Sequence, residues 1–481
     1  MIDTNEKNQK ALFYSTYKLP NRKNLKSSVS LNIFFKQYGL MKHLYLLFLL
    51  ITTTLLSQTD QKIYDIIDAV SEARIKADVK TLTEFGTRNT FSDTLSTSRG
   101  IGAARRWIKR TFEGISKDCD NCINVFYQKD LVTTQMSKRV PHDAWVVNVV
   151  AIQKGTRYPN KYIVMSGDID SRNSDGANFT KDAPGANDNA SGMAGTIEAA
   201  RVLSKYQFES SIIYVGLSGE EQGLFGGAGL AKYAKEKGWE IIGVLNNDMI
   251  GNITGVDGVI DNRAFRIFSE PVPANETERQ RRMRRFYGGE VDGISRQLAR
   301  YTHKTVRTYM PEMNPMMIYR LDRFGRGGHH RPFNDLGYAG IRIMEAHENY
   351  TQQHQDIRTE NGIAYGDTFK HVNFGYAKKL TAVNAITMAS LALAPPAPET
   401  VAVGGIVQAS AKLKWSKVPS AKGYKIYWRD TTSPTWDHSK YVEETQFTLD
   451  GIVIDNFFFG VAAVGKNGHE SVVVFPNKIM K

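Results

Sequence analysis

Residues 211–226 read SIIYVGLSGEEQGLFG, and this stretch carries the main signal for the fold. Its first seven residues form a mostly apolar run with the length of a buried strand. Two adjacent carboxylates flanked by glycines follow, and residues 224–234 then show a helical pattern. A strand that ends in an acidic loop and leads into a helix is typical of α/β proteins, in which sites form beyond the strand ends.

The same alternation recurs on both sides of this stretch. Further apolar runs predict strands at residues 146–152, 162–166, 240–245 and 340–344. Amphipathic or apolar helical patterns predict helices at residues 63–85, 101–115, 193–203 and 365–393. Strands that alternate with helices predict an α/β fold with helices on both faces of the sheet.

The C-terminal part has a different pattern. The 481 residues predict two or three domains, and the Pro-rich segment 394–400 ends the last helix as a stiff linker. Beyond it, β-type runs occupy residues 412–415, 424–428, 445–449, 457–464 and 471–475. Short strands at such spacing predict a small all-β sandwich. We therefore expect a large α/β domain at 58–393 and the sandwich at 401–481.

The N-terminal residues 1–57 are expected to lie outside both domains. Residues 41–57 read MKHLYLLFLLITTTLLS, a basic start, an apolar run and a small residue at the end, as in a secretory signal peptide. Met41 is then the expected start, and the product is secreted or periplasmic without an integral membrane segment. The alternative is a membrane anchor with a cytoplasmic tail, although the apolar run is short for a spanning helix.

Charge and cysteine content exclude several classes of protein. The net charge is +13, and removal of residues 1–57 takes away eight of 62 basic and two of 49 acidic residues, which leaves +7. No nucleic-acid-binding motif accompanies this modest excess, so no nucleic-acid partner is expected. Two cysteines exclude a disulfide-rich scaffold. Cys119 and Cys122 form a C-x-x-C pair, typical of redox or zinc sites in the cytosol but, after a signal peptide, of a local disulfide.

The acidic residues gather in loops that follow predicted strands. They are Asp168 and Asp170, Asp188, Glu220 and Glu221, and Asp248. Each motif alone is typical of a helix cap, a turn or a solvated surface, but their joint occurrence beside glycines indicates a site. Carboxylates that converge repel one another, and a divalent cation offsets that repulsion. His354 is the best candidate for a histidine ligand, and Asp356 is close enough in sequence to support it.

Four of these segments together resemble the M28 family of co-catalytic zinc exopeptidases. They are GANDNASG at 185–192, GEEQGLFGG at 219–227, NNDMIG at 246–251 and QHQDIRTENGIAYGD at 353–367. The resemblance covers about residues 60–393 and implies an α/β sandwich around a mixed sheet. It also implies an aminopeptidase that acts on peptides with two divalent cations, in the first place zinc. The C-terminal domain resembles a fibronectin type III module, with Trp415 in its core and a protein or glycan as its ligand.

The resemblance also implies a role for each residue. Asp188 would bridge two metals, Glu221 and His354 would complete one metal site, and Asp248 would serve the other. Glu220 would be the general base, and Asp170 would support a ligand. His330 would bind the substrate carbonyl or the oxyanion, against the alternative of a surface histidine. Arg323 and Arg326 would hold an acidic group or a peptide C-terminus, against the alternative of solvated arginines.

One position departs from the family pattern. The first metal motif is normally His-x-Asp, but this chain has Asp168-Ile169-Asp170. With Asp168 as a ligand, four carboxylates face two divalent cations, which predicts a weaker Lewis acid and a shift toward harder metals such as manganese. Two other functions therefore stay open: a glutaminyl cyclase-like acyltransferase that uses one zinc, and a non-catalytic binding protein.

Overall fold

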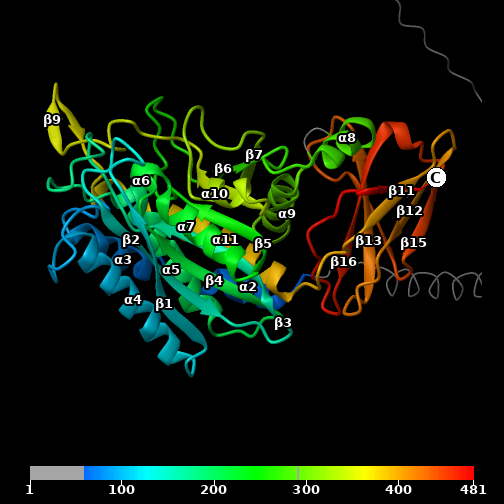
Figure 1. Cartoon of the computed structure of the whole chain (residues 1–481), viewed down its shortest axis with the longest axis horizontal. Helices are drawn as coiled ribbons and strands as arrows, with labels where there is room; N and C mark the ends of the chain where they lie inside the picture. Colours follow the sequence, from blue (N-terminus) through cyan, green and yellow to red (C-terminus); the bar gives the residue numbers. More distant parts are fainter. Residues whose placement is uncertain (1–58, 290–291, 481) are drawn as a thin grey trace, which may run out of the picture. The chain divides into compact units, whose positions relative to one another are not determined.

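A mixed sheet in the strand order β1-β2-β4-β3-β5-β8-β6-β7 forms the centre of the N-terminal part (Figure 1). The strands are β1 (Ile123–Val132), β2 (Ala144–Gln153), β3 (Tyr158–Asp168), β4 (Ser210–Leu217), β5 (Glu240–Asn247), β6 (Ala264–Ser269), β7 (Asn314–Ile318) and β8 (Gly340–Glu345). The computed structural model describes residues 59–289 and 292–480, and Thr59–Lys481 forms one compact unit. The expected signal peptide and the rest of residues 1–57 lie outside the described residues.

Four neighbouring strands of the sheet run parallel and bring the acidic loops together. These are β4, β3, β5 and β8. Their register pairs Asp168 with Leu217 and Gly167 with Asn247, so β3, β4 and β5 end at the same level. Because carboxyl ends of parallel strands meet at one edge, the segments that follow these strands converge there. The prediction of an α/β fold with a mixed sheet is confirmed.

Side chains of the central strands alternate between two apolar layers. Val149, Ile163 and Ile212 belong to one buried cluster, whereas their neighbours Val150, Val164 and Ile213 belong to another. The first layer includes apolar residues of α2 (Gln61–Ala69), α3 (Glu72–Glu84), α4 (Gly100–Asp118), α5 (Gly192–Leu203), α9 (Ile294–Tyr309) and α11 (Phe374–Leu393). The second includes those of α7 (Phe225–Glu236) and α10 (His330–Asp335). Helices therefore cover both faces, as predicted.

Two predicted helices have different limits in the structure. The segment predicted as one helix over 63–85 is two helices, because Ser71 caps α3 and its hydroxyl accepts a hydrogen bond from Arg74 N. The helix predicted from residue 365 begins at Phe374, after the capping side chain of Asn373. The residues before it form the strand β10 (Ile363–Tyr365), paired with β9 (Arg358–Glu360), and a short turn at Phe369–His371.

The C-terminal part is an all-β structure of two small sheets (Figure 1). One has the order β15-β12-β11-β17 and the other β14-β13-β16. The strands are β11 (Val401–Gly404), β12 (Ser410–Trp415), β13 (Gly423–Asp430), β14 (His438–Val442), β15 (Gln446–Asp450), β16 (Phe457–Val464) and β17 (Lys478–Ile479). Trp415 lies in a shared apolar core. The strand predicted at 471–475 is wrong, since only isolated bridges at Glu470 and Val474 occur there.

No helix in residues 59–289 and 292–480 is long and apolar enough to cross a bilayer.

Candidate active site

Three of the residues singled out in the sequence meet at the carboxyl edge of the sheet. The Nε2 atom of His354 lies 2.9 Å from Asp188 Oδ2 and 3.0 Å from Glu221 Oε1. In the described ranges, Asp188, Glu221 and His354 are the group whose ligand atoms all lie within 4.8 Å of one another in a way that suits a metal ion. Two carboxylates and an imidazole are a ligand set that zinc accepts.

The loop that carries Asp188 is held by a second carboxylate. Asp367 accepts hydrogen bonds from the backbone N–H groups of Asn187 at 2.8 Å and Asp188 at 2.7 Å. The side chain of Gln353 donates to Asp188 Oδ2 at 3.0 Å. Burial raises the pKa of Asp188, but His354 and Gln353 outweigh it and lower that pKa below its usual range. These contacts hold the backbone of Asp188 in place and favour its ionised side chain.

The two adjacent glutamates are positioned by Asp170. They begin the short helix α6 (Glu220–Gly223), which follows Gly219 at a positive φ of 75°. The carboxylate of Asp170 accepts from Glu220 N at 3.3 Å and from Glu221 N at 3.1 Å. Burial, together with Asp248 and Glu221, raises the pKa of Glu220 well above its ordinary value. Glu220 is therefore a strong proton acceptor once a nearby cation offsets the surrounding negative charge.

Asp248 follows β5 and is held by a buried arginine. Its Oδ2 atom lies 2.9 Å from an Nη atom of Arg342, whose Nε donates to the Asp248 carbonyl oxygen at 2.6 Å. The Oδ1 atom is buried without a hydrogen-bond partner. Burial raises the pKa of Asp248 to about 8, and Arg342 opposes this shift. Asp248 lines the same cavity as Asp188, Glu220, Glu221 and His354.

Asp168 has both oxygens engaged by other side chains. Its Oδ1 lies 2.6 Å from His329 Nδ1, and its Oδ2 accepts from Asn189 Nδ2 at 2.6 Å. Neither Asp168 nor His329 lines the cavity or belongs to the three-residue group, so the difference between them lies in their free atoms: Asp168 has none. The geometry thus gives no support to a direct Asp168–metal bond. His329 is fully buried, and its Nε2 has no hydrogen-bond partner.

Two further expectations about site residues do not match the positions in the structure. His330, expected to contact substrate, is buried, and its Nε2 hydrogen-bonds with the Leu321 carbonyl oxygen at 2.8 Å. Asp356, expected to support His354, instead contacts Ser174: it accepts from Ser174 N at 3.3 Å, and its own N–H donates to Ser174 Oγ. His354 has a positive φ of 56°, so the chain turns between His354 and Asp356.

Two buried ligand-type atoms at this edge lack hydrogen-bond partners. They are Asp248 Oδ1 and His329 Nε2. Unsatisfied buried acceptors are costly, and a bound cation is one physical reason for a fold to retain them. The residues present therefore fit a metal ion by donor chemistry as well as by the spacing of Asp188, Glu221 and His354.

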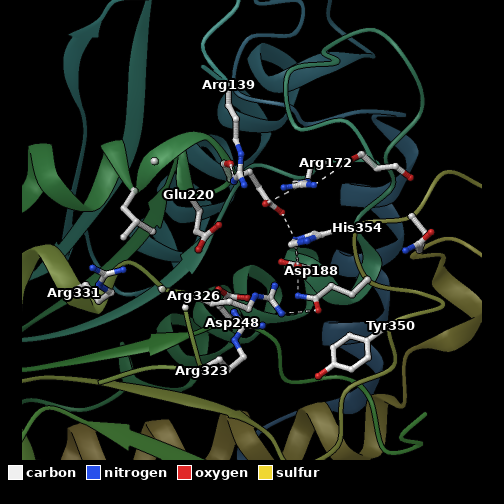
Figure 2. Close-up of a pocket in the computed structure, with 18 residues that line it drawn as sticks. Arg139, Arg172, Asp188, Glu220, Asp248, Arg323, Arg326, Arg331, Tyr350 and His354 are labelled. Atoms are coloured by element: carbon white, nitrogen blue, oxygen red, sulfur yellow. Dashed lines mark hydrogen bonds and ion pairs between the residues drawn. The ribbon is translucent and has the colours of Figure 1, made fainter. Parts of the chain in front are cut away.

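The site opens into a cavity of about 920 Å³. Figure 2 shows Glu220 on one side of it, His354 and Asp188 on the other, and arginine side chains around them. The lining arginines are Arg139, Arg172, Arg323, Arg326 and Arg331. A cavity of this volume accommodates a short peptide or another ligand of drug size.

Sequence reasoning missed Asp367, His329 and Arg342 as parts of this site. Asp367 ends the C-terminal segment that resembles the exopeptidases, so that motif contained a usable signal. Nothing in the sequence connects His329 with Asp168, because 161 positions separate them. Far from the cavity, Cys119 and Cys122 form a disulfide.

Comparison with known proteins gives the family. Residues 148–374 match the model described as peptidase family M28. A probable zinc metalloprotease of Pyrenophora teres f. teres is 39% identical over 422 residues, which cover 87% of each chain. A probable zinc metalloprotease of Leptosphaeria maculans is 38% identical over 420 residues, which cover 87% of this chain and 97% of that one.

Solved structures agree at the level of the fold. The LapA aminopeptidase of Legionella pneumophila is 17% identical with a TM-score of 0.50, and the match covers 71% of this chain and 79% of that one. LapB of the same organism is 16% identical with a TM-score of 0.50, over 69% and 75% of the two chains. The matched model spans the segments that supply Asp188, Glu221, Asp248 and His354. The chain therefore belongs to peptidase family M28 and is a metallopeptidase, a hydrolase of the zinc metalloprotease type.

Proposed function

We propose that the protein is an exported zinc aminopeptidase that removes residues from the N-terminus of peptides, with Glu220 as its general base. The observation that carries this proposal is the convergence of Asp188, Glu221 and His354 in a cavity that Glu220 lines from the other side.

The side chains divide the work according to their contacts. Asp188, Glu221 and His354 would hold the first zinc, which when bound lowers the pKa of water and polarises the carbonyl to be cleaved. Glu220 takes a proton from the attacking water and gives it to the leaving amine. Asp170 and Asp367 keep the backbone of the glutamates and of Asp188 in place through the hydrogen bonds described above.

A second cation would be held by Asp188, Asp248 and His329. Asp248 Oδ1 and His329 Nε2 are buried without hydrogen-bond partners, so both atoms are free to bind this second cation. Asp168 accepts from Nδ1 of His329, which leaves the Nε2 lone pair free, the arrangement that orients many metal-binding histidines. Arg342 engages the other oxygen of Asp248.

This assignment changes the expected metal. With His329 as the ligand in place of Asp168, three carboxylates and two imidazoles face two divalent cations. The charge count then equals that of the usual family motif, and the reason to expect manganese disappears. Zinc is the ion that this mixed carboxylate and imidazole set favours.

The test compares peptides that differ only at their N-terminus. The zinc-loaded protein is expected to cleave a free peptide at its first bond and to leave the N-acetylated peptide intact, as followed by mass spectrometry. Chelation should abolish cleavage, and zinc should restore it. Cleavage of acetylated peptides at internal bonds would contradict the proposal, as would cyclisation of N-terminal glutamine without cleavage or the absence of turnover with any divalent metal.

A further inference from the structure

Basic side chains outnumber acidic ones around the cavity. Five arginines line it, against the four carboxylates of Asp188, Glu220, Glu221 and Asp248. The carboxylates already have other tasks: two belong to the metal-binding group, and Asp248 pairs with Arg342 at 2.9 Å. A bound metal adds further positive charge. The wall of the cavity is therefore electropositive and suits an anionic substrate.

Four of the five arginines have partners within the protein. Arg139 donates to the Glu221 carbonyl oxygen at 2.8 Å. Arg323 and Arg326 lie 3.0 and 3.3 Å from Glu348 Oε2. Arg172 donates to the carbonyl oxygens of Asn173 and Ser174, with Glu221 Oε2 at 3.8 Å. These contacts occupy their guanidinium groups, so the expectation that Arg323 and Arg326 hold the anion loses its main support.

Arg331 is different because its guanidinium group lines the cavity and has no hydrogen-bond or ion-pair partner in the part of the chain that the structure describes. It is half-buried, and its Nε is buried with no hydrogen-bond partner. No ion pair to Arg331 occurs among residues 59–289 and 292–480, although Asp335 follows it by one helical turn. The glycine at position 327 makes room for it, since a Cβ there would lie 2.7 Å from Arg331 Nη1.

The position of Arg331 connects it to the reaction. It lines the cavity together with Leu224 and Gly223 at the end of the helix that begins with Glu220. Figure 2 shows Arg331 on the Glu220 side, away from His354. A substrate whose cleaved bond lies between Glu220 and the metal group would extend one of its adjacent residues toward this arginine.

We infer that Arg331 binds a carboxylate of the substrate, so that the enzyme prefers peptides with a carboxylate next to the cleaved bond. This inference rests on the proposed peptidase function. A guanidinium group pairs with a carboxylate through two parallel hydrogen bonds, and such a pair is strongest where water is partly excluded. The carboxylate is the shared chemistry, and it belongs either to an Asp or Glu side chain or to the C-terminus of a very short peptide.

Matched peptides test the inference and separate its two sources. C-terminally amidated tripeptides with Asp or Asn at the first or second position vary only the side-chain charge, and Ala-Ala with a free or amidated end varies only the C-terminus. For at least one pair, the wild-type kcat/KM is expected to be ~10-fold higher with the carboxylate. Arg331→Gln should reduce that ratio to within about twofold of unity, mainly through KM, and Arg331→Lys should restore part of it.

Arg320→Gln is the matched control. Arg320 is an exposed arginine that lies outside the cavity lining, so its removal takes away the same charge and should leave the ratio unchanged. Equal kcat/KM values for all charged and neutral pairs in the wild type would overturn the inference. So would a preference that survives Arg331→Gln in protein whose circular dichroism spectrum is unchanged.

A binding experiment keeps this result separate from the fate of the proposed function. Titration calorimetry of the Asp and Asn peptides into zinc-loaded Glu220→Gln protein needs no turnover. Tighter binding of the carboxylate peptides, lost in the Glu220→Gln/Arg331→Gln double variant, would support the inference even if no peptide were cleaved by the wild type. Equal dissociation constants would contradict it even if the wild type were an active aminopeptidase.

Discussion

The contact between Asp168 and His329 alters how the departure from the family motif is understood. In the sequence, Asp168 stands where the family has a histidine ligand, and a changed metal or a lost activity follows from that substitution alone. In the structure, Asp168 bonds to an imidazole whose second nitrogen is buried without a partner. In the proposed metal site, a histidine from a distant segment would therefore supply the donor type that the strand end lacks.

His329→Ala tests that assignment through metal content. We expect zinc per chain to fall from two to one, because Asp188, Glu221 and His354 do not depend on His329. Asp168→Asn should weaken the second ion by about 10–100-fold, since the carboxylate that orients the histidine is lost. Elemental analysis after dialysis against buffered zinc measures both. His438→Ala, an exposed histidine of the C-terminal part, is the control. Two zinc ions retained in His329→Ala would refute the role of this residue.

At the residue scale, the sequence identified the carboxylates and the histidine that line the cavity. Asp188, Glu220, Glu221, Asp248 and His354 all follow strands or lie in a recognisable motif, and strand ends meet predictably. The partners that fix them were beyond prediction, because they come from segments with no local signal. Whether a carboxylate binds a cation or another side chain depends on contacts across the fold, as Asp168 demonstrates.

At the scale of elements, the end of β8 holds two loops of the site. Glu345 is fully buried, accepts from Asn187 Nδ2 at 3.0 and 3.1 Å and accepts from Asn252 N at 2.8 Å. Burial raises the pKa of Glu345 to about 8. Because the folded-state pKa exceeds the unfolded value near 4.5, the protonated carboxyl is favoured in the fold, and its stabilisation is complete below pH ~4.5 and is lost as the pH rises toward 8.

Glu345→Gln should remove this pH dependence. Relative to the variant, the wild type is expected to lose on the order of a few kcal/mol of unfolding free energy between pH 5 and 8. Urea denaturation at several pH values measures the difference in unfolding free energy between the two proteins. The change of that difference with pH does not depend on any constant free-energy cost of the substitution. A difference between the two proteins that stays flat across this range would show that Glu345 titrates normally.

The central strands were predictable because their apolar runs are buried on both faces. The predicted strands at 162–166, 211–217 and 240–245 all lie within β3, β4 and β5. The edge strand β1 was missed, since only Ile123, Gln128 and Val132 of its ten residues are buried and polar residues interrupt the apolar run. The break between α2 and α3 depends on capping by Ser71, a hydrogen bond that apolar periodicity does not register.

At the scale of the whole molecule, a buried ionic cluster links the two parts of the compact unit. Asp292 lies 2.8 Å from Arg300 of α9 and 2.7 Å from Arg429 of β13. All three side chains are almost fully buried. Removal of the single carboxylate would leave two guanidinium groups facing each other in a site with little water. The domain limits at 393 and 401 remain a prediction, and this contact indicates that the parts do not behave as independent modules.

Asp292→Asn is therefore expected to destabilise the protein by about 3–5 kcal/mol. Urea denaturation followed by circular dichroism gives the change. Glu278→Gln is the control, because it breaks an ion pair with Arg281 in which the Glu278 side chain is 76% exposed and the Arg281 side chain 63% exposed. It should cost less than about 1 kcal/mol. Similar stabilities of the two variants would mean that the Asp292 cluster contributes no more than a surface pair.

The most direct test of the central claim measures zinc content and peptide hydrolysis on the same preparation of Glu220→Gln protein. The account predicts full zinc occupancy with kcat reduced by about 10²–10⁴-fold, because the ligands are intact and only the proton acceptor is lost. Hydrolysis within a few-fold of the wild type at full zinc occupancy would contradict the assignment of Glu220 as general base.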